Sequence, residues 1–310
     1  MDAAKARAAM KDMAKRLARL GVADEIALGL PLRLTASSWL FEAEQGGVPV
    51  ILKRVLGDGA ADTVHGMQAE LDRVSEIFGD GDCRANRCLQ AWPEAGLILL
   101  SHAPGVRLSD AIAAAAPENR ARLLQHAGRW LHRLTDARVR EIGFGPRKWL
   151  QKLADPQALP LRPVDRGRLA RLRASLTAQA PRLRGLPVRQ AATHGDYVGI
   201  NCHYHDGVIY GLDMQGEVWL AVARDVARFL VWQTLHDPTP SGPTRAGLRG
   251  EDVGAFLSSG VLPETEQSTV LPFFIGVDLH RRFTEAPADA AHLVRARAAI
   301  DAYLDAYPGG

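Results

Sequence analysis

The chain has 310 residues, of which 47% are hydrophobic and 24% are charged, a composition typical of globular proteins. This length is sufficient for one large domain or for two lobes with separate cores. The formal net charge of +3 is too small to predict a nucleic-acid partner. Three cysteines favour reduced thiols in the cytoplasm over a disulfide framework, and no apolar run reaches the roughly 18–20 residues of a membrane span.

The first third of the chain is predicted to be rich in strands. Apolar residues from Met10 to Leu20 recur at helical spacing until Gly21, which predicts an amphipathic helix over residues 3–20. Short β-like runs then alternate with turn residues. We expect strands at 39–43, 48–55, 88–92 and 96–101, with one helix at 62–79.

After Pro104-Gly105 the pattern changes to long helical segments. Helices are expected at 107–115, 118–137, 164–178, 220–236, 249–258, 268–285 and 287–306. Residues 191–213 interrupt this pattern with hairpin character, because Asp206-Gly207 is a strong turn signal.

A compact set of polar residues lies in this interruption. Asp196 is followed five residues later by Asn201, and Asp213 comes after the predicted hairpin. Carboxylate and amide oxygens suit Mg²⁺, which retains water and takes phosphate oxygens for its remaining positions. Since phosphoryl transfer needs mainly positioning and charge neutralisation, this set predicts a phosphoryl-transfer enzyme. The alternative is a surface turn, where such residues are common.

The spacing His194-Gly195-Asp196-(x4)-Asn201, followed by Asp213, resembles the aminoglycoside phosphotransferase and choline kinase group, which is similar in fold to the protein kinases. The resemblance spans about residues 30–235. It implies an α+β, protein kinase-like fold of two lobes, with a small β-rich N-terminal lobe and a larger, mainly helical C-terminal lobe. The expected ranges are 1–101 for the first lobe, 102–106 for the linker and 107–310 for the second lobe.

The resemblance also implies roles for these residues. Asp196 would orient the acceptor hydroxyl and take its proton, and Asn201 and Asp213 would be the Mg²⁺ ligands. His194 would hold the catalytic loop in shape rather than act as a base. Asp225, on a predicted helix, matches the aspartate that supports this loop.

Two residues of the first lobe are expected to act with this set. Lys53 is the lysine of an otherwise apolar strand, where it can meet the α- and β-phosphates. Seventeen residues later, Glu70 matches the helix glutamate that pairs with this lysine, and Glu76 is the alternative acid. Without the resemblance, Lys53 would be interpreted as a lysine that protects a strand edge.

Two further segments are expected to contact the nucleotide, ATP or GTP. The stretch Thr35-Ala36-Ser37-Ser38-Trp39 matches the phosphate-covering turn but contains no glycine, so Ser37 and Ser38 would contact phosphate through their amides and hydroxyls. The stretch from Leu99 to Gly105 resembles the inter-lobe linker, and Ser101 and Ala103 would read the adenine edge.

Other chemistries are less well supported. Zinc binding would have to use residues with loose spacing, namely Cys83, Cys88, Cys202, His203 and His205. The sequence contains neither the Gly-x-Ser-x-Gly turn of hydrolases nor a Gly-x-x-x-x-Gly-Lys-Ser/Thr phosphate loop.

The function predicted from the sequence is ATP-dependent, Mg²⁺-dependent transfer of the γ-phosphoryl group to a hydroxyl of a small molecule. The resemblance implies an aminoglycoside-, choline- or sugar-like acceptor. One alternative is a non-catalytic nucleotide- or partner-binding module. The other is a protein kinase, which Gly195 and the lack of an Ala-Pro-Glu segment after Asp213 disfavour.

The charge of the acceptor is left open by two segments of opposite sign. Residues 161–190 contain eight arginines and one acid, which favours an anionic acceptor. Residues 251–310 contain nine acids and four arginines, which favours a cationic one. The acids named for this role are Glu264, Glu266, Asp278, Glu285 and Asp289. A pair of mutually compensating elements would also explain both segments.

Overall fold

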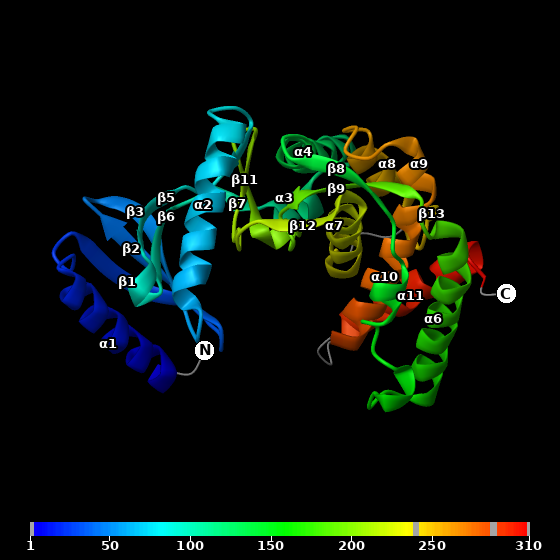
Figure 1. The fold of residues 1–310 in the computed structure, drawn as a ribbon, viewed down its shortest axis with the longest axis horizontal. Coiled ribbons are helices and arrows are strands. Elements are labelled where there is room, and N and C mark those ends of the chain that lie inside the picture. The colour runs from blue at the N-terminus through cyan, green and yellow to red at the C-terminus, as the bar shows by residue number, and fades with distance from the viewer. Residues whose placement is uncertain (1–2, 238–241, 286–289, 309–310) are drawn as a thin grey trace. The chain divides into compact units, whose positions relative to one another are not determined.

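The computed structural model describes residues 3–237, 242–285 and 290–308 (Figure 1). The chain forms two units: Met1–Gly105 with Tyr210–Glu217, and Val106–Ile209 with Val218–Gly310. An antiparallel sheet dominates the first unit and helices dominate the second, which confirms the predicted α+β class. Residues 210–217, expected within the second lobe at 107–310, belong to the first unit.

The sheet of the first unit has five strands in the order β1-β2-β3-β6-β5. They are β1 (Ile26–Leu34), β2 (Ser38–Gln45), β3 (Val48–Val55), β5 (Cys88–Trp92) and β6 (Leu97–Ser101). The four predicted strands are confirmed, and β1 was missed. Pro31 lies inside β1 and the register shifts on either side of it, because proline cannot donate a ladder hydrogen bond.

Two helices complete the first unit, α1 (Ala3–Leu20) and α2 (Ala60–Phe78), as predicted, together with η1 (Pro93–Ala95) and β4 (Cys83–Ala85). In α1, Met13 and Leu17 are buried in one apolar cluster with Phe41 of β2 and Leu52 of β3. The segment 210–217 joins this unit through Gly211, whose carbonyl accepts from the Asn86 N–H at 3.1 Å.

The second unit combines a small sheet with most of the helices. The sheet has the order β12-β9-β8, formed by β8 (Val139–Gly143), β9 (Pro187–Thr193) and β12 (Val218–Ala221). None of these strands was predicted, because they are short and carry no clear apolar alternation. The other short strands of this unit are β7 (Val106–Arg107), β10 (Cys202–His205), β13 (Thr244–Arg245) and β14 (Leu248–Arg249). Strand β11 (Val208–Gly211) begins in the second unit and ends in the first. The turn at Asp206-Gly207 is confirmed, since both residues have positive φ, 46° and 79°.

The predicted helices of the second unit are present with shifted ends. They are α3 (Leu108–Ala114), α4 (Pro117–Asp136), α6 (Pro163–Leu183), α7 (Val222–His236), α8 (Gly250–Leu257), α9 (Glu264–Ser268), α10 (Val270–Glu285) and α11 (Ala290–Ala306), with the short α5 (Arg147–Leu150), η2 (Pro156–Ala158) and η3 (Gly199–Asn201). The single helix expected at 268–285 is two helices, α9 and α10, separated at Thr269. Residues 287–289 of the last predicted helix lie outside the described ranges.

The aromatic core of the second unit lies beside the loop that follows β9. Tyr197 stacks on Trp130 of α4, with ring centroids 5.2 Å apart, and on Phe229 of α7, at 5.1 Å. Phe229 contacts Phe256 of α8 at 5.0 Å. A Cβ on Gly128 would lie 2.4 Å from the Phe256 carbonyl oxygen, so glycine is needed where α4 meets α8. This core fixes the position of Tyr197 and of the loop that carries it.

An ion pair links the two oppositely charged segments. Arg168 of α6 forms a two-pronged ion pair with Asp301 of α11, at 2.7 and 2.9 Å. Hydrogen bonding to Arg297 lowers the pKa of the buried Asp165. No described helix is long and apolar enough to cross a membrane.

Candidate active site

Residues of α7 hold the loop after β9 in place through hydrogen bonds. Gly195 has a φ of 77°, a left-handed conformation that glycine adopts readily. Its N–H donates to Oδ2 of the fully buried Asp225 at 2.8 Å, and its carbonyl accepts from Arg224. The prediction that Asp225 supports this loop is confirmed.

The Asp196 carboxylate is oriented by a residue that the sequence analysis missed. Arg228 of α7 places Nε 2.6 Å and Nη2 2.5 Å from Oδ1 of Asp196. The Asp196 side chain keeps 45% of its surface exposed, and none of the described residues donates a hydrogen bond to its Oδ2. The carboxylate therefore presents one free oxygen to solvent, as a group that receives a proton from a substrate must.

Asn201 and His194 shape the same loop. The Asn201 side chain donates from Nδ2 to the Asp196 carbonyl at 3.0 Å, which leaves its Oδ1 as the oxygen that can bind a metal ion. His194 is buried, and its Nδ1 accepts from the Asp196 N–H at 3.3 Å. These contacts agree with a ligand role for Asn201 and a scaffold role for His194, and both roles remain predictions.

The first unit brings together two predicted residues that are 160 positions apart. Lys53 of β3 is only 3% exposed, and its Nζ lies 2.5 Å from Oδ1 of Asp213. Gln215 donates to the same oxygen at 2.6 Å, and Arg33 lies 3.4 Å from Oδ2. Asp213 has a φ of 61°, which is uncommon for a residue other than glycine. Such strained conformations cluster at functional sites.

The predicted Lys53–Glu70 ion pair remains a prediction. Glu70 is fully buried in α2, and its Oε2 lies 3.3 Å from Nη2 of Arg73. Glu76, the alternative acid, is exposed. Burial makes Glu70 the better partner for a buried lysine, because a buried carboxylate needs a compensating charge.

The turn that would cover the phosphates is closed by hydrogen bonds of the Thr35 hydroxyl. Thr35 Oγ1 accepts from the N–H groups of Ser37 at 3.3 Å and Ser38 at 3.0 Å, and it donates to the Ser38 carbonyl at 2.9 Å. Both amides that were expected to meet a phosphate therefore already have a partner. Contact between a phosphate and Ser37 or Ser38 remains a prediction, and for the amides it requires this turn to open.

The expected adenine-reading residues lie at the end of β6. The Ser101 hydroxyl accepts from the Arg87 N–H at 2.8 Å, and the Ser101 N–H donates to the Arg87 carbonyl at 2.9 Å. Ala103 is buried. Ser101 thus helps to build the segment, and nucleotide contact by either residue remains a prediction.

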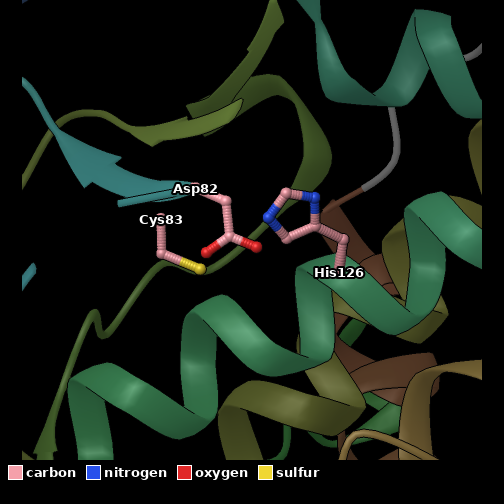
Figure 2. A group of neighbouring side chains, drawn as sticks. All are labelled: Asp82, Cys83 and His126. Atoms are coloured by element: carbon pink, nitrogen blue, oxygen red, sulfur yellow. The ribbon is translucent and has the colours of Figure 1, made fainter. Parts of the chain in front are cut away.

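Cys83, Cys88 and Cys202 form no disulfide. Burial raises the pKa of the Cys88 thiol to about 11 and also raises that of Cys202, which disfavours the thiolate form of both. In Figure 2 the Cys83 side chain lies beside that of its chain neighbour Asp82 at the start of β4. His126, also labelled there, belongs to α4 of the second unit.

Three of the acids expected to attract a cationic acceptor, Glu266, Asp278 and Glu285, already have a hydrogen-bond or ion-pair partner. Glu266 accepts from the Arg189 N–H at 2.9 Å, and burial raises its pKa. Asp278 accepts from Arg281 at 2.9 Å. Asp289 lies outside the described residues.

The metal ligands proposed from the sequence come from both units. Asn201 belongs to the second unit with Asp196, whereas Asp213 belongs to the first with Lys53. The convergence of these groups on one metal ion therefore remains a prediction.

Comparison with known proteins identifies the fold. No family model and no curated protein matches the sequence. An amicoumacin kinase in complex with AMP-PNP, Ca²⁺ and Ami matches with a TM-score of 0.56 and 18% identity, over 94% of this chain and 95% of the other. An aminoglycoside phosphotransferase with AMP-PNP and hygromycin B matches with a TM-score of 0.58 and 16% identity, over 96% of this chain and 99% of the other. A choline kinase from Streptococcus pneumoniae matches with a TM-score of 0.54 and 15% identity, over 96% of this chain and 99% of the other. The chain has the protein kinase-like fold of these small-molecule kinases.

Proposed function

We propose, from the fold that this chain shares with small-molecule kinases, that it is an ATP-dependent and Mg²⁺-dependent phosphotransferase acting on a hydroxyl of a small molecule. The shared fold supports phosphoryl transfer as the reaction class. Because fold alone does not specify function, the argument for catalysis depends on the residues of the site.

The observation that carries the proposal is the geometry of Asp196. Arg228 holds Oδ1, the loop carbonyl of Asp196 accepts from Asn201, and Oδ2 faces outward without a donor from the described residues. A buried structural aspartate would have both oxygens satisfied by protein groups, whereas the Asp196 side chain is 45% exposed. This carboxylate is instead oriented and accessible, which is the arrangement of a group that receives a proton.

In the proposed mechanism, Asp196 Oδ2 accepts the hydrogen of the acceptor hydroxyl and directs the hydroxyl oxygen toward the phosphoryl group. It takes the proton late, since the transition state of this reaction is loose. Arg228 keeps the carboxylate in position during the transfer. Positioned proton acceptors of this kind typically contribute about 10²–10⁴-fold to the rate.

The residues present suit the groups that the reaction requires. Asn201 Oδ1 and the Asp213 carboxylate are hard oxygen donors of the kind that bind Mg²⁺, and they would hold the ion. Lys53, kept in a buried ion pair with Asp213, is the cation that would contact the nucleotide phosphates. Bound Mg²⁺ and ATP would supply charge neutralisation and the phosphoryl group.

The direct test is the substitution Asp196→Asn. We expect ATP affinity in the presence of Mg²⁺ to stay within about twofold, whereas turnover falls about 10²–10⁴-fold because the proton acceptor is lost. ADP release would be measured with a panel of sugars, amines, amino alcohols and hydroxy acids. If the variant kept nearly full turnover on an acceptor of the wild-type protein, Asp196 would not be the proton acceptor.

The second candidate function is nucleotide binding without catalysis. The observation that favours it is the turn at Thr35, whose hydroxyl occupies the amides expected to hold a phosphate. A binding module would bind ATP in a Mg²⁺-dependent manner and release no ADP with any acceptor, whereas a kinase would do both.

A further inference from the structure

Arg33 of β1 shares one face of the first unit's sheet with Lys53. Strand pairing places Arg33 opposite Leu40 of β2, and Leu40 opposite Lys53 of β3. Side chains of directly opposite residues project from the same face of a sheet, so the two cations lie on either side of Leu40. Because neighbouring strands are about 4.8 Å apart, the two positions are separated by about 10 Å. Two long side chains at this separation can reach one group between them.

That group is the Asp213 carboxylate. Lys53 Nζ lies 2.5 Å from its Oδ1, and Arg33 Nη2 lies 3.4 Å from its Oδ2. All three residues belong to the first unit, so their arrangement is internal to that unit. One carboxylate is therefore shared by two cations, and it is the carboxylate proposed above as a metal ligand.

The two cations are held very differently. The Lys53 side chain is only 4% exposed, whereas the Arg33 side chain is 50% exposed. Arg33 reaches Asp213 with one nitrogen, and it forms no other hydrogen bond or ion pair with a residue that the structure describes. Since exposed ion pairs of this kind contribute little to stability, Arg33 can leave Asp213 at little cost.

Strand β1 leads into the turn that would cover the phosphates. Thr35 follows Arg33 by two residues, and its hydroxyl accepts from the amides of Ser37 and Ser38. While the turn is closed, these amides are not available to a phosphate. A guanidinium carries five N–H donors in a planar fork, and the single contact with Asp213 leaves most of those of Arg33 for another acceptor.

We propose that Arg33 is a phosphate-binding residue of the nucleotide site. Its guanidinium leaves Asp213 Oδ2 and binds the β- and γ-phosphates, in place of the amides of the closed turn. The metal ion of such sites bridges these two phosphates, so a cation beside the metal ligand Asp213 lies beside them as well. The planar fork of arginine suits phosphate because it can form two parallel hydrogen bonds. This proposal rests on the proposed function, to whose nucleotide site it adds a residue.

The test compares nucleotides that differ in the number of phosphates. Calorimetry measures the Kd of AMP-PNP, ADP and AMP, first with Mg²⁺ and then with EDTA in its place. The variants are Arg33→Gln and Arg33→Lys, and urea unfolding verifies that each keeps its fold.

Arg16→Gln is the matched control. Arg16 also pairs with an aspartate that two cations share, because Asp12 contacts both Arg16 and Arg54. The helix that carries Arg16 packs on Phe41 and Leu52. These residues alternate with Leu40 and Lys53 along their strands, so they project from the other face of the sheet.

With Mg²⁺, we expect Arg33→Gln to weaken AMP-PNP binding about 10- to 100-fold, as for lost hydrogen bonds to a charged group. ADP should lose less, and AMP should stay within about twofold, because it lacks the phosphates that Arg33 contacts. Arg33→Lys should recover part of the loss, since it keeps the charge without the fork. Arg16→Gln should leave all three affinities unchanged. The AMP-PNP loss should persist in EDTA, because the contact is direct.

Three results would overturn the proposal: unchanged AMP-PNP affinity in Arg33→Gln, equal losses for AMP-PNP and AMP, or a loss that disappears in EDTA. The last would mean that Arg33 only supports Asp213 as a metal ligand. If Arg33→Gln did not fold, Arg33→Lys would carry the same comparison with a smaller loss. ADP release with the acceptor panel separates this proposal from the proposed function. The expected loss of AMP-PNP affinity in a protein that releases no ADP would support Arg33 and count against the kinase.

Discussion

Asp196 is oriented by a residue 32 positions away in the sequence. Both contacts from Arg228 reach the same carboxylate oxygen, so the side chain is fixed in rotation while the second oxygen stays accessible. The Arg228 side chain is only 10% exposed, whereas the Asp196 side chain is 45% exposed. Arg228 is therefore a positioning residue: it sets the direction of the carboxylate and does not itself need to touch a substrate.

Replacing Arg228 should separate turnover from nucleotide binding. In Arg228→Gln the Asp196 carboxylate loses its fixed orientation, and we expect kcat to fall roughly 10- to 100-fold, with the Kd of ATP in the presence of Mg²⁺ unchanged. Arg228→Lys should recover part of the loss, because it restores a cation but not the two-pronged contact. Equal losses in kcat and nucleotide affinity, with no recovery by lysine, would indicate a role in folding alone.

At the scale of elements, α1 depends on the sheet that it packs against. The helix carries many charged residues, and it buries Ala9, Met13 and Leu17 in the apolar cluster of the first unit. Arg54 of β3 forms an ion pair with Asp12 of α1 and lies 4.6 Å from the Trp39 ring centroid. Since most helical stability in proteins comes from packing of an apolar face, α1 should be stable only when docked.

Shortening one buried side chain of α1 tests this dependence. Leu17→Ala should lower the free energy of unfolding of the first unit by about 2–5 kcal/mol, because it removes buried methyl groups and leaves a cavity. Lys15→Ala, an exposed position on the same helix, should change it by less than about 0.5 kcal/mol. Urea unfolding followed by tryptophan fluorescence measures both. Similar values for the two variants would show that α1 is not docked as described.

At the scale of the whole molecule, buried titratable groups link stability to pH. His280 has its pKa lowered to about 4 by burial, whereas an unfolded histidine has a pKa of about 6.5. Between these values the unfolded chain binds a proton that the folded protein does not. The stability contribution of neutral His280 is therefore complete above about pH 6.5 and is lost as the pH falls toward 4.

This linkage predicts a difference between the native protein and His280→Leu. From pH 7.5 to pH 5, the native protein should lose about 2 kcal/mol more of its unfolding free energy than the variant does. Denaturant unfolding at the two pH values measures it, and the comparison removes the contributions of other groups. The same loss in both proteins would mean that His280 titrates normally in the folded state.

Much of the fold follows from local patterns. The periodic helices and the strands on either side of Gly46-Gly47 were predicted because their signals lie within one short window. The strands β8, β9 and β12 were missed because they are short and lack a clear apolar alternation, so only pairing with neighbouring strands makes them regular. Asp196 and Asn201 were found because they lie five residues apart in a recognisable spacing.

The sequence by itself determined the kinase-like fold class, the His194-Gly195-Asp196-(x4)-Asn201 motif and the residue types available for chemistry, since each of these is encoded within a few residues. Only the tertiary structure decided that Lys53 pairs with Asp213, that Arg228 orients Asp196, and that Asp278 serves two arginines. Lys53–Asp213 and Arg228–Asp196 join positions far apart in the chain. Their partners are chosen by strand register, helix packing and burial, which a local pattern of residues does not contain.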